Sequence, residues 1–413
     1  MKSRYPAWRS VSGYLAGATA ARLGDEMSGP AIVLLAYAVT RAPAAGSALL
    51  AALTIAAAVG GPVFGVLLDR APRPERLLAL TLAAYALGIL AISAGVGRLP
   101  LAAMIVIALA AGILNPAVAA GWSAQLPRLV AGDSLQRASS LDGLTYSTAG
   151  LAGPGLAAVV AAVLGARLAV IAAAALVGLA APAALAAWRQ ASVPRPRKPP
   201  FRPAAGLAAI AAIPRLRRAT ATSAVSYVGV GMLLICCPVL GAQRLGGAAR
   251  GPLLISAMAA ACLGANALLA RRQVRREPDF RVFASTLILA ASLAALAIAP
   301  GWLTLAAVAL GGAGEGPQLT ALFAVRHRES PEHMRGQVFS TAASLKIAGM
   351  SAGAALAGPL VGWSLTGCLL AAAGAELCAA ATYLLTGPAL GHRAGQMRPG
   401  TEHLAAEPTV ASP

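Results

Sequence analysis

Seven ionisable side chains interrupt the long apolar stretches of this 413-residue chain: Arg22, Asp25, Glu26, Asp142, Glu315, Lys346 and Glu376. A charge at the centre of an apolar helix costs about 2.5–3.5 kcal/mol on insertion scales, so such residues are kept mainly where they face a partner or a cavity. A carboxylate in that setting can bind a cation or exchange a proton. The residue types therefore predict binding and movement of a small charged species.

Asp25 and Glu26 are the central pair. Neighbouring residues on a helix point about 100° apart, so at most one of the two carboxylates points straight at a central cavity. Arg22 precedes them by three and four residues, within pairing reach of either. One interpretation makes at least one carboxylate a proton or cation site tuned by Arg22. The other makes it a structural partner of Arg22.

Glu315 lies in a glycine-rich run, with Gln318 one turn later. Such a run predicts close helix contact or a broken helix whose free backbone groups face a cavity. Glu315 and Gln318 could contact substrate, or Glu315 could bond the backbone at a packing kink. Lys346 needs an acidic partner or water, and Glu315 is a candidate. Asn115 could line the same pathway, although Pro116 beside it also explains a kink.

The elements that position these residues are long enough to cross a membrane. The chain is 58% hydrophobic and 11% charged, with a mean hydropathy of +0.73, whereas soluble domains carry about 25% charged residues. Runs of about 20 apolar residues match the roughly 30 Å of a bilayer core. We predict an all-α integral membrane protein with twelve transmembrane helices, at residues 12–39, 46–68, 77–97, 99–122, 138–163, 167–188, 219–241, 251–270, 282–299, 301–324, 337–362 and 365–387.

The basic residues give the expected orientation. Of 33 Lys and Arg, 26 fall on the side of the N-terminus, five on the other side and two within spans. Because cytoplasmic loops carry the excess of Lys and Arg, we expect a multi-pass protein of the cell membrane with both termini cytoplasmic. The net charge of +19 does not indicate nucleic-acid binding, since the basic residues form no face with interleaved aromatics.

A basic, proline-rich segment, 191–218, divides the chain near its middle and predicts a cytoplasmic linker. Residues 1–190 and 219–387 then each hold six spans, as two pseudo-repeats. We expect 388–413 to be a disordered cytoplasmic tail. The sequence LAGP occurs at matching positions of the fifth and eleventh spans. Duplicated six-helix halves are the architecture of many secondary transporters.

The segment GVLLDR at residues 65–70 resembles the signature loop of the major facilitator superfamily, between the second and third spans. The resemblance implies that Asp69 caps a neighbouring helix and pairs with basic residues such as Arg70 and Arg73, forming a latch between conformational states. A carboxylate is favoured at a helix N-terminus, and its pairing can differ between two packings. We expect Asp142, near the same end of the fifth span, to be a latch or cap residue.

The resemblance to that superfamily covers about residues 12–387, and the fifth span adds a second likeness. Its sequence GLAGPG resembles the motif of the exporter branches of that superfamily. Gly150, Gly153 and Gly155 remove side chains along one helix face, and Pro154 permits a bend. This suits a closely packed helix between two rocking halves, whereas the alternative is ordinary transmembrane packing. The sequence RLGD in the first span is similar to the branch that contains siderophore and macrolide exporters.

We therefore expect a secondary active transporter, major-facilitator-like in fold. It would export a small amphipathic or drug-like compound by alternating access coupled to a proton or another ion. We expect a monomer in the lipid bilayer. An uptake carrier for a small polar metabolite is the second interpretation, and a membrane enzyme or non-transporting membrane sensor is the third. The sequence has no Walker-type loop, metal-ligand spacing or hydrolytic triad, so we expect no cofactor, no metal site and no enzyme.

Overall fold

The computed structural model describes residues 5–40, 43–130, 133–187, 202, 204–246, 251–271 and 277–386. These residues form helices and connecting turns, without a strand among them. Each predicted span corresponds to a helix, one of them broken, so the predicted fold class is confirmed. Residues 191–201 and 203 of the predicted linker, and the whole predicted tail 388–413, lie outside the described residues.

The spans of the N-terminal half are α1 (Tyr5–Thr40), α2 (Pro43–Arg70), α3 (Pro74–Gly95), α4 (Leu101–Gly112) with its continuation, α6 (Asp133–Leu164) and α7 (Ala166–Ala187). Those of the C-terminal half are α9 (Pro214–Arg244), α10 (Gly251–Arg271), α11 (Pro278–Ile298), α12 (Leu303–Glu329), α13 (Arg335–Trp363) and α14 (Leu365–Leu385). A short helix, α8 (Ala205–Ala212), lies within the segment predicted to be a linker and packs against α9 and α13.

Short hairpins join neighbouring helices where the sequence predicts tight turns. Gly97, Gly165 and Gly301 have φ angles of +83°, +95° and +44°. Glycine adopts this left-handed region without the steric cost that other residues meet. The three glycines therefore let the chain reverse direction within a few residues.

The fourth predicted span is broken at its middle. α4 ends at Gly112, and the helix resumes as a π-helical turn, η1 (Ala117–Gly121), followed by α5 (Trp122–Gln125). Asn115 and Pro116 lie in the break. Proline has no N–H to donate and its ring crowds the preceding turn, which explains why the helix cannot run straight through.

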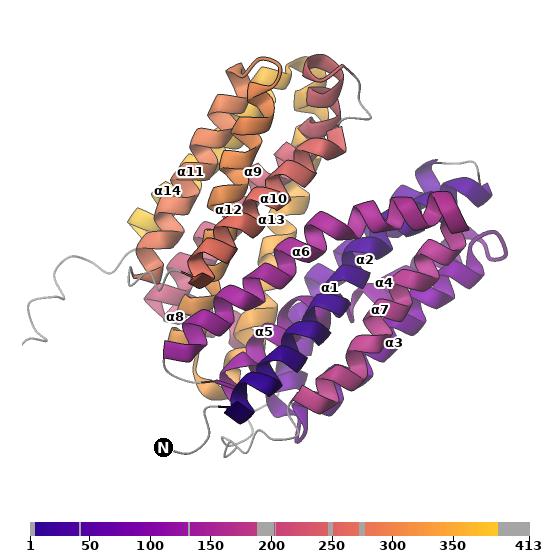
Figure 1. Cartoon of the computed structure of the whole chain (residues 1–413), viewed down its shortest axis with the longest axis vertical. Coiled ribbons are helices and arrows are strands. Elements are labelled where there is room, and N and C mark those ends of the chain that lie inside the picture. Colours follow the sequence, from indigo (N-terminus) through magenta and orange to yellow (C-terminus); the bar gives the residue numbers. More distant parts are fainter. Residues whose placement is uncertain are drawn as a thin grey trace, which may run out of the picture.

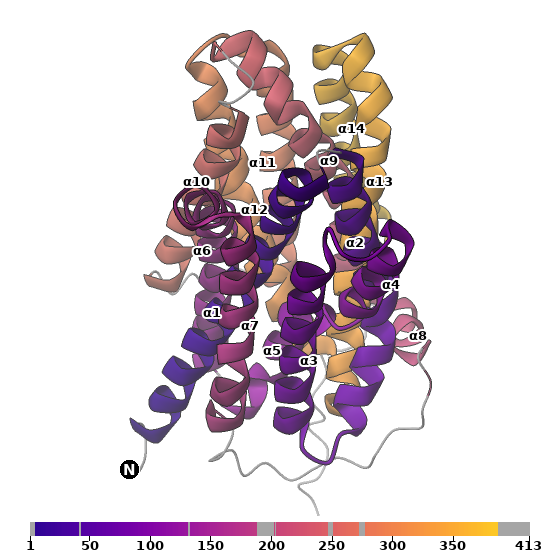
Figure 2. The ribbon, with the colours of Figure 1, turned by 90° about the vertical axis from the view of Figure 1, so that its right-hand side faces the viewer.

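The helices form two bundles, one from each half (Figures 1 and 2). Buried apolar side chains of α1, α3, α6 and α7 make the core of the first bundle. Those of α9, α10, α11 and α14 make much of the core of the second. The bundles contact each other mainly through α2 with α13 and α6 with α10. In Figure 1 they lie together near the N-terminus and diverge away from it.

We call the end of the molecule that holds the N-terminus the N-terminal face. α2 and α10 end there, whereas α6 and α13 begin there. The other end is the opposite face.

Glycines allow α9 and α13 to approach within backbone contact. A Cβ atom added at Gly353 would lie 2.0 Å from the carbonyl oxygen of Val228, and one at Gly231 would lie 2.1 Å from that of Met350. Such close approach is how helices gain packing energy in lipid, where apolar burial gives no advantage over the lipid tails.

Replacing Gly353 by alanine is therefore expected to destabilise the protein by about 1–3 kcal/mol, because the helices must separate. Gly358→Ala is the matched control on the same helix, since no heavy atom lies within 4 Å of its added Cβ. Thermal unfolding of the two variants in detergent tests this. Equal melting temperatures would show that α9 and α13 do not pack in this way.

Judged by length and composition alone, ten of the twelve spans contain a described helix that is long and apolar enough to cross a membrane. The two that do not qualify are α1 and α12. They hold Arg22, Asp25, Glu26 and Glu315, four of the seven ionisable residues that interrupt the apolar stretches of the sequence.

Candidate functional site

A cluster of charged side chains lies between the two bundles, near the middle of their helices. Glu26 comes from α1, whereas Glu315, Lys346 and Tyr227 come from α12, α13 and α9. Tyr227 donates a hydrogen bond to Glu315 Oε1 at 3.1 Å. Lys346 Nζ lies 4.1 Å from the centroid of the Tyr227 ring, a cation–π contact.

Lys346 stands between the acids of the two bundles. It interacts electrostatically with Glu315 of its own bundle and with Glu26 of the other. Over the described part of the chain, however, it forms no salt bridge within 4.0 Å. The ammonium group thus interacts with carboxylates of both bundles, more strongly with Glu315 than with Glu26.

Glu26 is solvent-exposed although protein surrounds it. We call the space into which it projects the central opening. Gly153 supports this position, since a Cβ there would lie 2.5 Å from Glu26 Cβ. The glycine therefore lets α6 pack directly against α1 beside the exposed carboxylate.

Asp25 points instead into the N-terminal bundle. Its Oδ1 atom accepts hydrogen bonds from Tyr85 Oη at 2.6 Å and Asn115 Nδ2 at 2.7 Å. Asn115 also donates to Tyr85 Oη at 3.2 Å. The break after α4 places Asn115 there, so the predicted kink occurs, whereas a role of Asn115 in lining the substrate pathway stays a prediction. The adjacent carboxylates face different surroundings, as the helical geometry requires.

Arg22 does not pair with Asp25 or Glu26, which corrects the sequence-based expectation. Its Nη1 atom lies 2.7 Å from Asp142 Oδ1 on α6, and the two side chains are 2% and 0% exposed. Ser123 accepts from Arg22 Nη2 at 3.0 Å, and the guanidinium stacks 3.6 Å above the Tyr146 ring.

Asp142 also accepts hydrogen bonds from Tyr14 at 2.8 Å and Ser123 at 2.5 Å. A carboxylate on a neighbouring helix with two further donors balances Arg22 better than an acid on α1 already held elsewhere. All of these contacts lie inside the N-terminal bundle. Asp142 is therefore placed as the counter-ion of Arg22, and its predicted role as a latch or cap is not supported by its contacts.

Gln318 is likewise directed away from the central opening. It is buried, and its Nε2 atom donates to Ser226 Oγ at 3.2 Å and Thr286 Oγ1 at 2.9 Å. These partners lie on α9 and α11 of the same bundle. Gln318 thus links three helices of the C-terminal bundle, and the predicted contact with substrate does not fit its position.

At the N-terminal face the bundles are joined first through Asp69. Its carboxylate accepts the backbone N–H groups of Gly336 at 2.6 Å and Gln337 at 2.8 Å, at the start of α13. The carboxylate thus caps a helix of the other bundle, where the helix dipole favours a negative charge. Arg335 interacts electrostatically with this carboxylate. Arg70 ends α2, and Arg73 is exposed just before α3.

Replacing Asp69 by alanine is expected to shift the protein toward the state that is open at the N-terminal face, because two charge-assisted hydrogen bonds across the bundles are lost. With about 1.5 kcal/mol or more for each of the two bonds, the shift in the equilibrium should reach about 100-fold. The measurement is maleimide labelling of a reporter, Ser340→Cys, in a chain without its native cysteines. Ser340 is fully buried here. Arg73→Ala is the control. Equal labelling in both variants would show that Asp69 does not stabilise the state that is closed at the N-terminal face.

A second polar contact joins α6 to α10 and α12 at the same face. Asn266 Nδ2 donates to Ser147 Oγ at 3.2 Å, and Thr320 Oγ1 donates to Asn266 Oδ1 at 3.0 Å. Ser147 also lies 3.0 Å from the sulfur of Cys262. This contact was not predicted from the sequence. The feature that could have indicated it is a lone asparagine within an apolar span, because a buried amide needs hydrogen-bond partners.

The glycines of the fifth-span motif behave differently from the prediction. Gly150 and Gly155, on either side of Pro154, have no heavy atom within 4 Å of an added Cβ, and Gly358 in the eleventh span is the same. Only Gly153 is closely packed, and its contact is with α1 of its own bundle. The three glycines therefore show no close packing against the other bundle in the state described.

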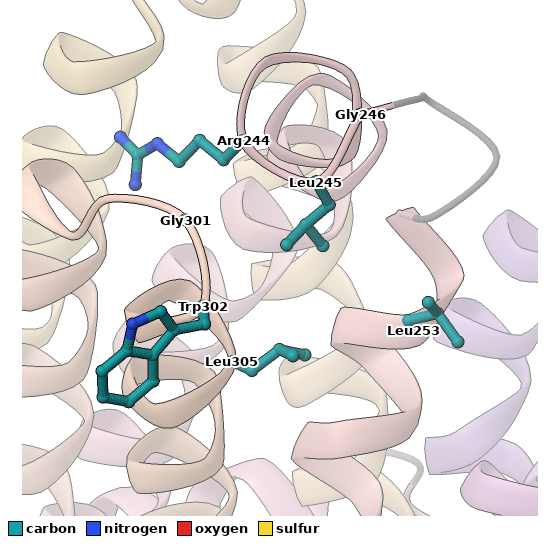
Figure 3. A pocket seen from close by; sticks show the side chains of 7 residues that line it. All are labelled: Arg244, Leu245, Gly246, Leu253, Gly301, Trp302 and Leu305. Carbon is teal, nitrogen blue, oxygen red and sulfur yellow. The ribbon is translucent and has the colours of Figure 1, made fainter.

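A cavity of about 600 Å³ lies elsewhere, at the opposite face of the C-terminal bundle (Figure 3). It is lined by Arg244, Leu245, Gly246, Leu253, Gly301, Trp302 and Leu305. Its one charged side chain, Arg244, donates to the carbonyl groups of Leu296 and Ala297, which end α11. The exposed Trp302 is typical of a membrane–water interface. The cavity is separate from the central charges.

The chain matches the family model described as Major Facilitator Superfamily over residues 14–354. Its fold resembles the crystal structure of a bacterial homologue of the iron transporter ferroportin in an outward-facing state, with a TM-score of 0.75 and 14% identity over 92% of this chain and 99% of that one. It also resembles the human organic anion transporter MFSD10, with a TM-score of 0.72 and 16% identity over 92% and 100% of the chains. The E. coli fucose:proton symporter FucP follows, with a TM-score of 0.68 and 14% identity over 93% and 99%.

No curated protein matches the chain. The identities to the solved structures are low enough that these show the fold alone. The family match, in contrast, covers most of the sequence and agrees with twelve spans in two bundles. The chain belongs to the Major Facilitator Superfamily.

Proposed function

We propose that the chain is a secondary active transporter that works by alternating access in the cell membrane, with both termini in the cytoplasm. The observation that carries the proposal is Glu26, which is exposed between two bundles that contact each other at the N-terminal face. Lys346 stands between Glu26 and Glu315 without a salt bridge to either. With the N-terminal face in the cytoplasm, the state described is outward-facing.

Glu26 is the proposed site of proton exchange. In the outward-facing state it takes up a proton from the external side. Its attraction for Lys346 is then lost, and Lys346 is left to Glu315 of its own bundle. The electrostatic link between the bundles weakens, and they can reorient. A substrate that binds from the cytoplasm displaces the proton and restores the first arrangement after its export.

Export of a small amphipathic compound is the proposed direction and substrate class. The fifth-span likeness to exporters supports the direction. The composition of the helices supports the substrate class, since a few charged groups stand among helices rich in Ala, Leu and Gly. A compound with one polar group and an apolar body would match both the charged groups and the apolar helices.

The test is transport in inside-out vesicles that hold a pH-sensitive dye, with a panel of antibiotics and siderophores. We expect substrate-evoked proton release in the wild type and its loss in Glu26→Gln, since glutamine takes up no proton. Substrate movement without proton movement would remove proton coupling from the proposal. Substrate accumulation that requires a proton gradient of the opposite direction would favour the uptake carrier.

A further inference from the structure

A second acidic site lies behind the central cluster, in the C-terminal bundle. Glu376 of α14 is 0% exposed. Neither of its carboxylate oxygens has a hydrogen-bond partner among the described residues. Leu370 and Leu377 on the same helix are exposed, toward lipid in a membrane. Glu376 instead faces α9.

Gly229 of α9 makes the space for this side chain. A Cβ at Gly229 would lie 3.1 Å from Glu376 Oε1 and 2.8 Å from the carbonyl oxygen of Ala372. Any larger residue would therefore press on the carboxyl group and on the backbone of α14. The two helices are shaped around a buried acid.

Within the described residues, Glu376 forms no salt bridge, so no nearby cation balances the charge of a carboxylate. The titratable groups that face it are Tyr227 of α9 and Glu315 of α12, neither of which is basic. Burying an unpaired carboxylate costs several kcal/mol of free energy, whereas burying the neutral acid costs far less.

From this geometry we infer that Glu376 holds a proton and is a second proton-binding site of the transporter, coupled to the central cluster through α9. Ser226 and Tyr227 are adjacent on that helix. Tyr227 donates to Glu315, and Ser226, which accepts from Gln318, lies beside Glu376. The hydroxyl proton of Ser226 remains available to the carboxyl group.

A movement of α9 connects the two acids. When Glu315 changes its partner from Tyr227 to Lys346, α9 is released at Tyr227, and Ser226 moves with it. Water can then reach Glu376, whose O–H bond breaks as the proton passes to that water. The carboxylate that remains is hydrated rather than buried. Rebinding of a proton reverses the step.

This inference rests on the proposed transport function, and two measurements separate them. The first uses dicyclohexylcarbodiimide, which reacts with protonated carboxyl groups in apolar surroundings, on the full chain in proteoliposomes. Peptide mass spectrometry should find the adduct at Glu376, less of it as the pH rises, and less in Gly229→Ala, where the carboxyl group is crowded. No adduct at any pH would overturn the protonated state.

The second measurement is the number of protons moved per substrate. Glu376→Gln keeps the shape of the neutral acid and should move one proton fewer than the wild type, whereas Glu376→Asp should keep the wild-type ratio. If Glu376→Gln folds poorly, the carbodiimide-treated wild type replaces it. An unchanged ratio overturns the inference even where the adduct forms. If the wild type transports substrate without moving protons, the proposed coupling is contradicted instead. The labelling result would still show that Glu376 holds a proton.

Discussion

Replacing Glu26 by glutamine is expected to reduce proton-driven transport by about 100-fold or more, the scale on which loss of a proton-transfer group acts. Glutamine keeps the size of the side chain and its place beside Gly153, but it takes up no proton. Lys346 would then be drawn only to Glu315 in both states. Substrate-evoked proton movement in vesicles is the measurement, with protein amount matched to the wild type.

Glu75→Gln is the matched control for Glu26→Gln. Glu75 lies at the N-terminal face in a loose pair with Arg128, 3.7 Å away. Its replacement should leave transport near the wild-type rate, because partly exposed pairs contribute little. If Glu26→Gln transports as well as this control does, the exposed carboxylate is not the proton site and the proposed coupling fails.

Replacing Arg22 by methionine is expected to lower the free energy of unfolding by about 3–5 kcal/mol, because the carboxylate of Asp142 is left buried without its charge partner. The double variant Arg22→Met/Asp142→Leu should recover much of this loss, since it removes both charges. Unfolding in detergent, followed by heat or denaturant, measures the four members of this mutant cycle.

An exposed ion pair gives the comparison. Arg215 lies 3.0 Å from Glu329 and is 51% exposed, so Arg215→Met should cost about 1 kcal/mol or less. Equal losses for Arg22→Met and Arg215→Met would contradict the burial of the Arg22–Asp142 pair. A double variant less stable than either single variant would mean that the surrounding donors, and not the pair, set the cost.

The spans could be predicted from the sequence because their signal is local. A run of about 20 apolar residues needs no knowledge of its neighbours to be recognised. The break after α4 was also foreseeable, since Pro116 acts on its own helix. Most helices also begin and end within about five residues of the predicted bounds, whereas α1 begins seven residues earlier than predicted.

The partners of the charged residues could not be predicted in this way. Arg22 pairs with Asp142, 120 positions away, because α1 and α6 happen to pack with these faces together. Packing between helices in lipid depends on small differences in side-chain size, which hydropathy does not record. For the same reason Arg326, expected in a loop, is buried at the end of α12. The family likeness, in contrast, led to Asp69 and the helix that it caps.

The position of Glu26 has an electrical consequence. In the proposed outward-facing state, water reaches this carboxylate from the opposite face, whereas the contacts of Asp69 and Asn266 hold the two bundles together. A membrane potential therefore falls mostly across the thin closed layer between Glu26 and that face, and little of it falls across the wet side. Each elementary charge carried through 100 mV is worth about 2.3 kcal/mol. A proton would gain this energy when the bundles reorient rather than when it binds, so the voltage would set the rate of the conformational step and leave the apparent affinity for protons nearly unchanged.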